Sequence, residues 1–203
     1  MALENFSGKT FVAFLDISGF KELMKKEKAI SALDTFYQAG YEALSNYGEL
    51  KGIFVSDSGI LYATEDIEIE KFRKILEAVK YINKQMLDKD YMLKASIAFG
   101  EFNYYKRIEL PNISKGMILG NAYLSAYLDS QKVDAGLCRI IKANLPEAIV
   151  IENFPLLKQR GNYYYYYWNI SENSIDKDSE INKFEEYYKN SKYLGILKAL
   201  KNT

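Results

Sequence analysis

Residues 10–20 read TFVAFLDISGF, an apolar run that ends in an aspartate followed by small, turn-forming residues. Such a run is typical of a buried strand that delivers an acidic side chain to the edge of a sheet. We therefore predict a strand over residues 10–17 with Asp16 near its carboxyl end. The next residues, 18–20, are expected to open a helix whose first N–H groups can hold phosphate oxygens.

A second acidic residue lies at the tip of a predicted hairpin. Two short apolar runs, residues 52–55 and 60–62, flank a Ser-Asp-Ser-Gly turn that contains Asp57. In a split β-α-β arrangement the first strand and this hairpin are neighbours, so the carboxylates of Asp16 and Asp57 meet at one edge. Two carboxylates there suit Mg²⁺ or Mn²⁺, which prefer oxygen ligands. The alternative is that Asp16 caps a helix and Asp57 is an ordinary turn residue.

The rest of the chain alternates between helical and strand patterns. Helices are predicted over residues 21–46, 70–87, 121–132 and 183–201. Further strands are predicted over residues 93–99, 148–151 and 163–170, and loops over residues 108–116 and 171–180. This order predicts a single α+β domain over residues 1–203. Its core, residues 10–170, is a ferredoxin-like βαββαβ unit with a mixed, mainly antiparallel sheet and helices packed on it.

Composition limits the chemistry that is open to the chain. The 27 basic and 27 acidic residues cancel, so the positive excess typical of proteins that bind nucleic acid or anionic membrane is absent. The sequence has no histidine, which excludes imidazole acid–base catalysis and imidazole metal sites. The single cysteine, Cys138, cannot form an internal disulfide, and the apolar stretch near the N-terminus is too short to cross a bilayer. We expect a cytoplasmic protein with neither a nucleic acid nor a membrane partner.

Four segments, in this order along the chain, resemble the class III adenylate and guanylate cyclases. The opening strand FVAFLDISGF (residues 11–20) and the hairpin KGIFVSDSGILYA (residues 51–63) are similar to the two segments that carry the metal-binding aspartates of that family. LKASIAFGEF (residues 93–102) resembles its central strand, and ILGNAYLSAYLDSQK (residues 118–132) resembles the glycine-led segment and helix that follow. The joint pattern makes the resemblance specific, since each segment alone is common.

Two details resemble one branch of this superfamily. The turn reads Ser-Asp-Ser around Asp57, and the later helix reads Gly-x-Ala-x-x-x-Ala-Tyr, followed by Arg139 and Ile140. Both are similar to the stand-alone pyrimidine (cytidylate and uridylate) cyclases of bacterial antiphage defence, which make cyclic CMP or cyclic UMP. The resemblance implies a homodimer and a separate effector protein that reads the cyclic nucleotide.

The resemblance also implies roles for individual residues. Asp16 and Asp57 match the catalytic aspartates that hold two Mg²⁺ or Mn²⁺ ions, and the carbonyl oxygen of Ile17 adds a ligand. The implied nucleotide-binding residues are Ser18, Gly19, Phe20, Lys51, Lys94 and Arg160. Lys158 is the alternative to Arg160 as the cation for the terminal phosphates, and Lys51 and Lys94 are equally compatible with surface positions.

The helix predicted over residues 121–132 departs from the family pattern. The asparagine and arginine that purine cyclases place there fall on Leu124 and Leu128, which cannot orient a ribose or stabilise a charged transition state. The nearby candidates for that contact are Asn121, Tyr123, Tyr127 and Lys132, although core or interface packing also explains the two tyrosines.

Two functions follow from these features. The first is a metal-dependent cyclase that converts a nucleoside triphosphate, with CTP and UTP as candidates, into a 3′,5′-cyclic nucleotide and pyrophosphate. The alternative is a degenerate cyclase-like domain that binds nucleotides or regulates without turnover. A polymerase-palm or diguanylate-cyclase relative shares the β-α-β-β core, but its Gly-Gly-Asp/Glu hairpin differs from the Val-Ser-Asp-Ser sequence at residues 55–58.

Overall fold

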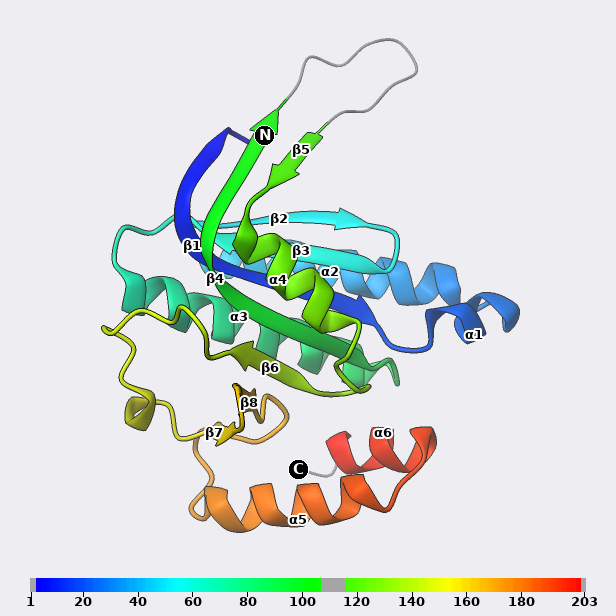
Figure 1. The fold of residues 1–203 in the computed structure, drawn as a ribbon. Coiled ribbons are helices and arrows are strands. Elements are labelled where there is room, and N and C mark those ends of the chain that lie inside the picture. The colour runs from blue at the N-terminus through cyan, green and yellow to red at the C-terminus, as the bar shows by residue number, and fades with distance from the viewer. Residues whose placement is uncertain (1–2, 107–115, 202–203) are drawn as a thin grey trace.

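The computed structural model describes residues 3–106 and 116–201 (Figure 1). Within them the centre is an eight-stranded sheet of order β2-β3-β1-β4-β6-β8-β7, with β5 paired to β4. Its strands are β1 (Phe6–Ile17), β2 (Leu50–Val55), β3 (Ser58–Ala63), β4 (Leu93–Lys106), β5 (Gly116–Leu119), β6 (Cys138–Ile141), β7 (Leu157–Arg160) and β8 (Tyr163–Tyr166). The helices are α1 (Phe20–Lys25), α2 (Ala29–Asn46), α3 (Glu68–Asp88), α4 (Asn121–Ser130), the short 3₁₀ turn η1 (Ile151–Asn153), α5 (Lys177–Lys189) and α6 (Tyr193–Lys201).

The sheet is mixed and mainly antiparallel, as the α+β prediction requires. β1 is antiparallel to β4 along its whole length and antiparallel to β3 on its other side, and only the β4–β6 pair is parallel among the described strands. The strands predicted over residues 10–17 and 93–99 are therefore confirmed, and both extend further than predicted. The predicted hairpin is β2–β3.

Helices cover the two faces of the sheet differently (Figure 1). One face packs against α2 and α3 and forms the larger core, which includes Phe11 and Leu15 of β1 and Phe72 of α3. The other face is covered by α4, whose Ala122 and Ala126 pack with β1 residues of opposite parity in a smaller core. Because β1 is buried on both faces, its sequence is a continuous apolar run rather than an alternating one.

Several predicted elements need correction. The helix predicted over residues 21–46 is divided into α1 and α2, with Glu27 between them at a left-handed φ of 59°. The strand predicted over residues 148–151 is wrong: this segment leads into the turn η1, and the sheet is completed by β6 and β7. The strand predicted over residues 163–170 ends at Tyr166. The loop predicted over residues 108–116 lies outside the described residues except for Gly116, which begins β5.

The C-terminal segment is a helical hairpin and not one helix over residues 183–201. The helix α5 begins within the predicted loop because the Asp176 side chain accepts a hydrogen bond from the Ser179 N–H at 3.0 Å, which caps its first turn. A break at residues 190–192 then separates α5 from α6. No helix in the described ranges is long and apolar enough to cross a membrane.

Candidate active site

Asp16 and Asp57 lie side by side at one edge of the sheet. The pairing of β1 with β3 sets Asp16 opposite Ser58, and the Ile17 N–H donates a hydrogen bond to the carbonyl oxygen of Asp57 at 3.0 Å. The residues are 41 positions apart in the sequence, yet the hairpin returns the second to the end of the first strand. The fold therefore brings Asp16 and Asp57 together, as the strand order predicts.

Lys94 of β4 completes a small charged cluster with this pair. Its Nζ lies 3.2 Å from Oδ2 of Asp16, and the two side chains are only 18% and 20% exposed. The hydroxyl of Ser58 donates to Oδ1 of Asp16 at 3.4 Å. Burial raises the pKa of the Asp16 carboxyl, the Lys94 ammonium lowers it and the neighbouring Asp57 charge raises it, with a net upward shift. The carboxylate pair therefore carries negative charge that Lys94 offsets only in part.

The loop after β1 has one backbone donor fewer than the sequence implied. The Ser18 N–H already donates to the carbonyl oxygen of Met92 at 2.8 Å, so the N–H groups that remain for a phosphate are those of Gly19 and Phe20. Gly19 has a φ of 75°, a left-handed conformation that glycine adopts without strain. The Ser18 side chain is buried, and its hydroxyl has no hydrogen-bond partner in the described chain.

These residues fit divalent cations. The buried hydroxyl of Ser18, two residues after Asp16 in the chain, is costly unless a further polar group satisfies it. The described residues contain no group of three or more acidic, Cys or His side chains that could form a complete cage. Any ion at this edge therefore takes its remaining ligands from the backbone, water or a phosphate, which is the usual arrangement for Mg²⁺.

Of the predicted cations, Lys94 belongs to this cluster, and the others lie outside it within one chain. Lys51 of β2 is exposed and paired with Tyr62, at the end of the hairpin remote from Asp57. Arg160 of β7 forms an ion pair with Glu185 of α5. Lys158, its alternative, pairs with Asp178 at 2.6 Å, also on α5. Acidic side chains of α5 thus neutralise the positive charge of both Arg160 and Lys158, the two candidates to bind the terminal phosphates.

The helix α4 presents apolar residues at the positions where the resemblance to purine cyclases implies polar ones. Leu124 and Leu128 are 53% and 52% exposed. The ring of Tyr127 packs edge-on to Phe14 at 5.4 Å, close to the site but engaged in packing. Asn121 lies over Gly100, where a built Cβ would come within 2.3 Å of its Oδ1. Gly100 therefore makes room for the first residue of α4.

One buried polar cluster was missed from the sequence. Arg139 of β6 donates to both carboxylate oxygens of Asp129, at 2.5 and 2.8 Å, and the Ser96 hydroxyl donates to Asp129 at 2.7 Å. The Tyr163 ring lies 4.2 Å from the guanidinium carbon of Arg139. The cluster fixes the end of α4 to β4 and β6. Its only sequence signal is a pair of opposite charges ten residues apart.

The sequence matches no established family profile and no curated protein. Solved structures do match. The adenylyl cyclase CyaB from P. aeruginosa aligns over 85% of this chain and 100% of its own, with a TM-score of 0.62 and 17% identity. The dimeric guanylyl cyclase domain of RhoGC from Blastocladiella emersonii aligns over 81% and 98%, with a TM-score of 0.64 and 11% identity. This chain has the fold of a nucleotidyl cyclase domain.

Within this fold, the edge of the sheet that carries Asp16 and Asp57 holds two carboxylates that can bind metal ions. The guanylate cyclase domain of RhGC from Catenaria anguillulae, solved in complex with GTP, shares the fold over 68% of this chain and 80% of its own, with a TM-score of 0.56 and 12% identity. At such identities the likeness establishes the fold, and the chemistry has to be argued from the residues.

Proposed function

We propose that this chain is a metal-dependent nucleotidyl cyclase that converts a nucleoside triphosphate into a 3′,5′-cyclic nucleotide and pyrophosphate. The observation that carries the proposal is the convergence of Asp16 and Asp57 at one edge of a cyclase fold, with the backbone of Ile17 bonded to that of Asp57 at 3.0 Å. A scaffold without this chemistry has no evident need for two adjacent carboxylates, one of them desolvated.

In this reaction the 3′-oxygen of the ribose forms a bond to the α-phosphorus, and the bond from that phosphorus to the pyrophosphate oxygen breaks. The hydroxyl proton leaves to solvent, and pyrophosphate carries away the bonding electron pair. Asp16, Asp57 and the carbonyl oxygen of Ile17 would hold two Mg²⁺ or Mn²⁺ ions, which supply Lewis acidity to the hydroxyl and neutralise the phosphates.

Cationic side chains complete the proposed site. Lys94 lowers the pKa of Asp16 against the larger effect of burial, and it is placed to turn toward a phosphate once other positive charge compensates the carboxylate. Arg160, with Lys158 as its neighbour, supplies the cation for the terminal phosphates in competition with the acidic side chains of α5. Gly19 and Phe20 donate backbone N–H groups, and Lys51 contacts the nucleotide across a composite site.

CTP and UTP are the proposed substrates, and antiphage signalling in the cytoplasm is the proposed setting. What supports them is the Ser-Asp-Ser turn around Asp57 and the Gly-x-Ala-x-x-x-Ala-Tyr pattern of α4 followed by Arg139 and Ile140, both similar to the pyrimidine branch. A separate effector protein would then read the cyclic nucleotide.

Dimerisation is part of this proposal because Asp57 and Lys51 lie at opposite ends of one hairpin in a single chain. A site that uses both needs a second copy. Exposed apolar residues on and before α4 support a contact there, namely Leu119, Leu124, Tyr127 and Leu128. Asn121 and Tyr127 would contact the ribose from that surface.

A specific observation favours a second candidate, a catalytically degenerate domain that binds nucleotide without turnover. Leu124 and Leu128 stand where purine cyclases stabilise the transition state, and the loss of one such group costs on the order of a hundredfold in rate. Nucleotide affinity without product would then be the only activity.

The test is incubation of the purified chain with each of the four nucleoside triphosphates and Mn²⁺, with cyclic product and pyrophosphate measured by mass spectrometry. We expect product from CTP or UTP, and its loss in Asp57→Asn but not in the control Asp66→Asn, whose side chain is exposed. Binding without product from any triphosphate would establish the degenerate alternative. Equal turnover in Asp57→Asn would remove the proposed site.

A further inference from the structure

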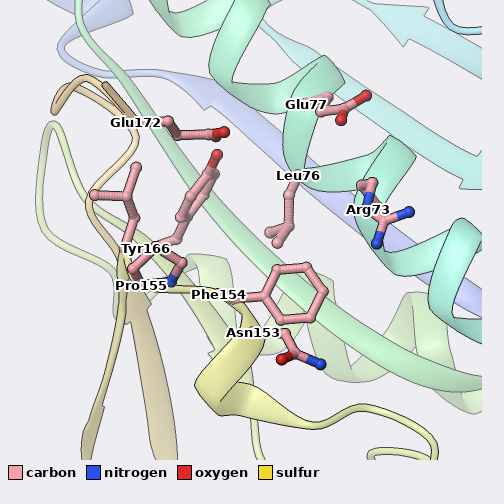
Figure 2. Close-up of a pocket in the computed structure, with 9 residues that line it drawn as sticks. Arg73, Leu76, Glu77, Asn153, Phe154, Pro155, Tyr166 and Glu172 are labelled. Carbon is pink, nitrogen blue, oxygen red and sulfur yellow. The ribbon is translucent and has the colours of Figure 1, made fainter. Parts of the chain in front are cut away.

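A cavity of about 130 Å³ lies between α3 and the strand β8, on the face of the sheet opposite α4 (Figure 2). Hydrocarbon from Leu76, Phe154, Pro155 and Leu156 forms one part of its wall. Glu77, Glu172 and the Tyr166 hydroxyl supply polar groups. A cavity of this size is close to that of the roughly 150 Å³ apolar cavity known to admit benzene.

Tyr166 is a buried residue of the cavity wall whose hydroxyl lacks a hydrogen-bond partner among the described residues. Only 5% of the residue is exposed, and its hydroxyl makes no hydrogen bond in the described chain. Figure 2 shows the phenol directed toward the carboxylate of Glu172. Burial and the charges of Glu172 and Glu77 raise the pKa of Tyr166 well above its ordinary value, so the hydroxyl stays protonated and retains its lone pairs as acceptors.

The charges around the cavity leave one carboxylate without a partner. Arg73 pairs with Glu70 at 2.6 Å, and Lys80 pairs with Glu172 at 3.3 Å. Glu77 is half-buried and forms neither a hydrogen bond nor an ion pair with any described residue. Burial and the nearby charge of Glu172 raise the pKa of Glu77, and the charges of Arg73 and Lys74 lower it by less, so the net shift is upward. A positive charge at this point would relieve both costs.

We infer that this cavity binds a small organic ammonium ion, with its charge on Glu77 and Glu172 and its hydrocarbon part against Phe154 and Leu76. The ammonium group donates hydrogen bonds to the two carboxylates and to the oxygen of Tyr166. The aromatic faces of Phe154 and Tyr166 favour a cation further. This site is independent of the proposed cyclase reaction.

An inorganic cation fits the same walls less well. The described residues contain no cluster of three acidic, Cys or His side chains, and much of the lining is hydrocarbon, which offers no ligand to a hydrated ion. An anion would meet the unpaired carboxylate of Glu77. Arg73 also lines the cavity, but its guanidinium pairs with Glu70. The apolar wall, the acceptor hydroxyl and the two carboxylates therefore match an amine carried on a ring or a short chain.

The test is isothermal titration of the full chain with benzylammonium and with benzyl alcohol, its neutral counterpart of similar shape. We expect binding of the ammonium and at least about tenfold weaker binding of the alcohol, because hydrogen bonds to charged groups are the strong ones. Glu77→Gln and Glu172→Gln should each weaken ammonium binding about tenfold. Tyr166→Phe should weaken it severalfold.

Two controls keep the result specific. Glu147→Gln removes an exposed carboxylate that does not line the cavity, and Asp57→Asn disables the proposed cyclase site; both should bind benzylammonium as the unmodified chain does. The absence of ammonium binding, equal binding of the alcohol, or unchanged affinity in both Glu77→Gln and Glu172→Gln would overturn the inference. Loss of cyclase activity alone would leave it intact.

Discussion

The hydroxyl of Tyr193 donates a hydrogen bond to the carbonyl oxygen of Ser18, with 3.2 Å between the two oxygens and 175 residues between them in the sequence. The Tyr193 ring also lies over Gly19, where a built Cβ would come within 3.4 Å of it. The first residue of α6 therefore supports the loop that follows Asp16. The same hairpin ties a neighbouring loop, since Tyr188 donates to the Ala135 carbonyl oxygen at 2.7 Å.

Substitution of Tyr193 by Phe should lower the free energy of unfolding by about 1 kcal/mol, the usual net contribution of one hydrogen bond. The ring and its packing on Gly19 remain, so the loss isolates the hydroxyl. Urea denaturation measures the change. The matched control is Tyr187→Phe on α5, an exposed tyrosine with no hydrogen bond from its hydroxyl in the described chain, which should change stability by less than about 0.5 kcal/mol. Equal changes in the two variants would contradict a structural role for the contact.

Substitution of Tyr62 by Phe should have the opposite sign and stabilise the chain. Tyr62 is fully buried in the smaller core, and its hydroxyl has no hydrogen-bond partner among the described residues. Removal of an unsatisfied buried hydroxyl relieves a desolvation cost, so we expect a gain of about 1 kcal/mol in urea denaturation. Tyr41→Phe, at a 68% exposed position, is the neutral reference. A loss of stability in Tyr62→Phe would mean that the hydroxyl is satisfied in solution.

The same residue predicts a pH dependence. Burial, with a smaller effect of Tyr104, raises the pKa of Tyr62 from 10.0 to about 12. Because the folded pKa is the higher one, the stabilising contribution is complete below pH 10 and is lost as the pH rises toward about 12. Stability measured between pH 9 and about 12 should therefore fall more steeply in the unmodified chain than in Tyr62→Phe. Parallel curves would rule out this titration.

The sequence was sufficient for the part of the fold in which local pattern and burial agree. The apolar run at residues 10–17 and the apolar stripe on α3 both consist of side chains that face the core. Both elements could therefore be predicted from their sequence pattern. The convergence of Asp16 and Asp57 followed from the strand order of a split β-α-β arrangement together with the resemblance to the cyclases. Short strands at the sheet margin carry no such signal: β7 reads Leu-Lys-Gln-Arg, and only its pairing with β8 makes it a strand.

Contacts made late in the chain were beyond prediction for a similar reason. Whether Arg160 is free or paired depends on where Glu185 of α5 falls, and that depends on how the hairpin docks. The engagement of the Ser18 N–H by Met92 likewise depends on the register of β4 against β1. Residue type indicated the chemistry of the site, while tertiary packing decided which groups are available.

Substitution of Arg139 by Met should be strongly destabilising. It leaves the Asp129 carboxylate, 6% exposed, without its cation and with the neutral hydroxyls of Ser96 and Tyr163 as side-chain donors. Breaking a buried ion pair from one side costs about 3–5 kcal/mol. The double variant Arg139→Met/Asp129→Leu should recover much of that loss because no buried charge is left unpaired. A double-mutant cycle by urea denaturation measures the coupling, and a double variant less stable than Arg139→Met would contradict it.

Substitution of both Leu124 and Leu128 by Glu tests the proposed dimer surface. Each leucine is about half exposed in the single chain, and its burial against a second copy contributes on the order of 1 kcal/mol. Glutamates at both positions remove this hydrophobic contribution to dimer stability. They also place like charges opposite each other across a twofold axis. Light scattering coupled to size exclusion should show a dimer for the unmodified chain and a monomer for the double variant. Leu194→Glu, at a 78% exposed position on α6, should leave the mass unchanged. If the unmodified chain is monomeric at the highest attainable concentration with nucleotide and Mn²⁺ present, a composite site that joins Lys51 to Asp57 cannot form.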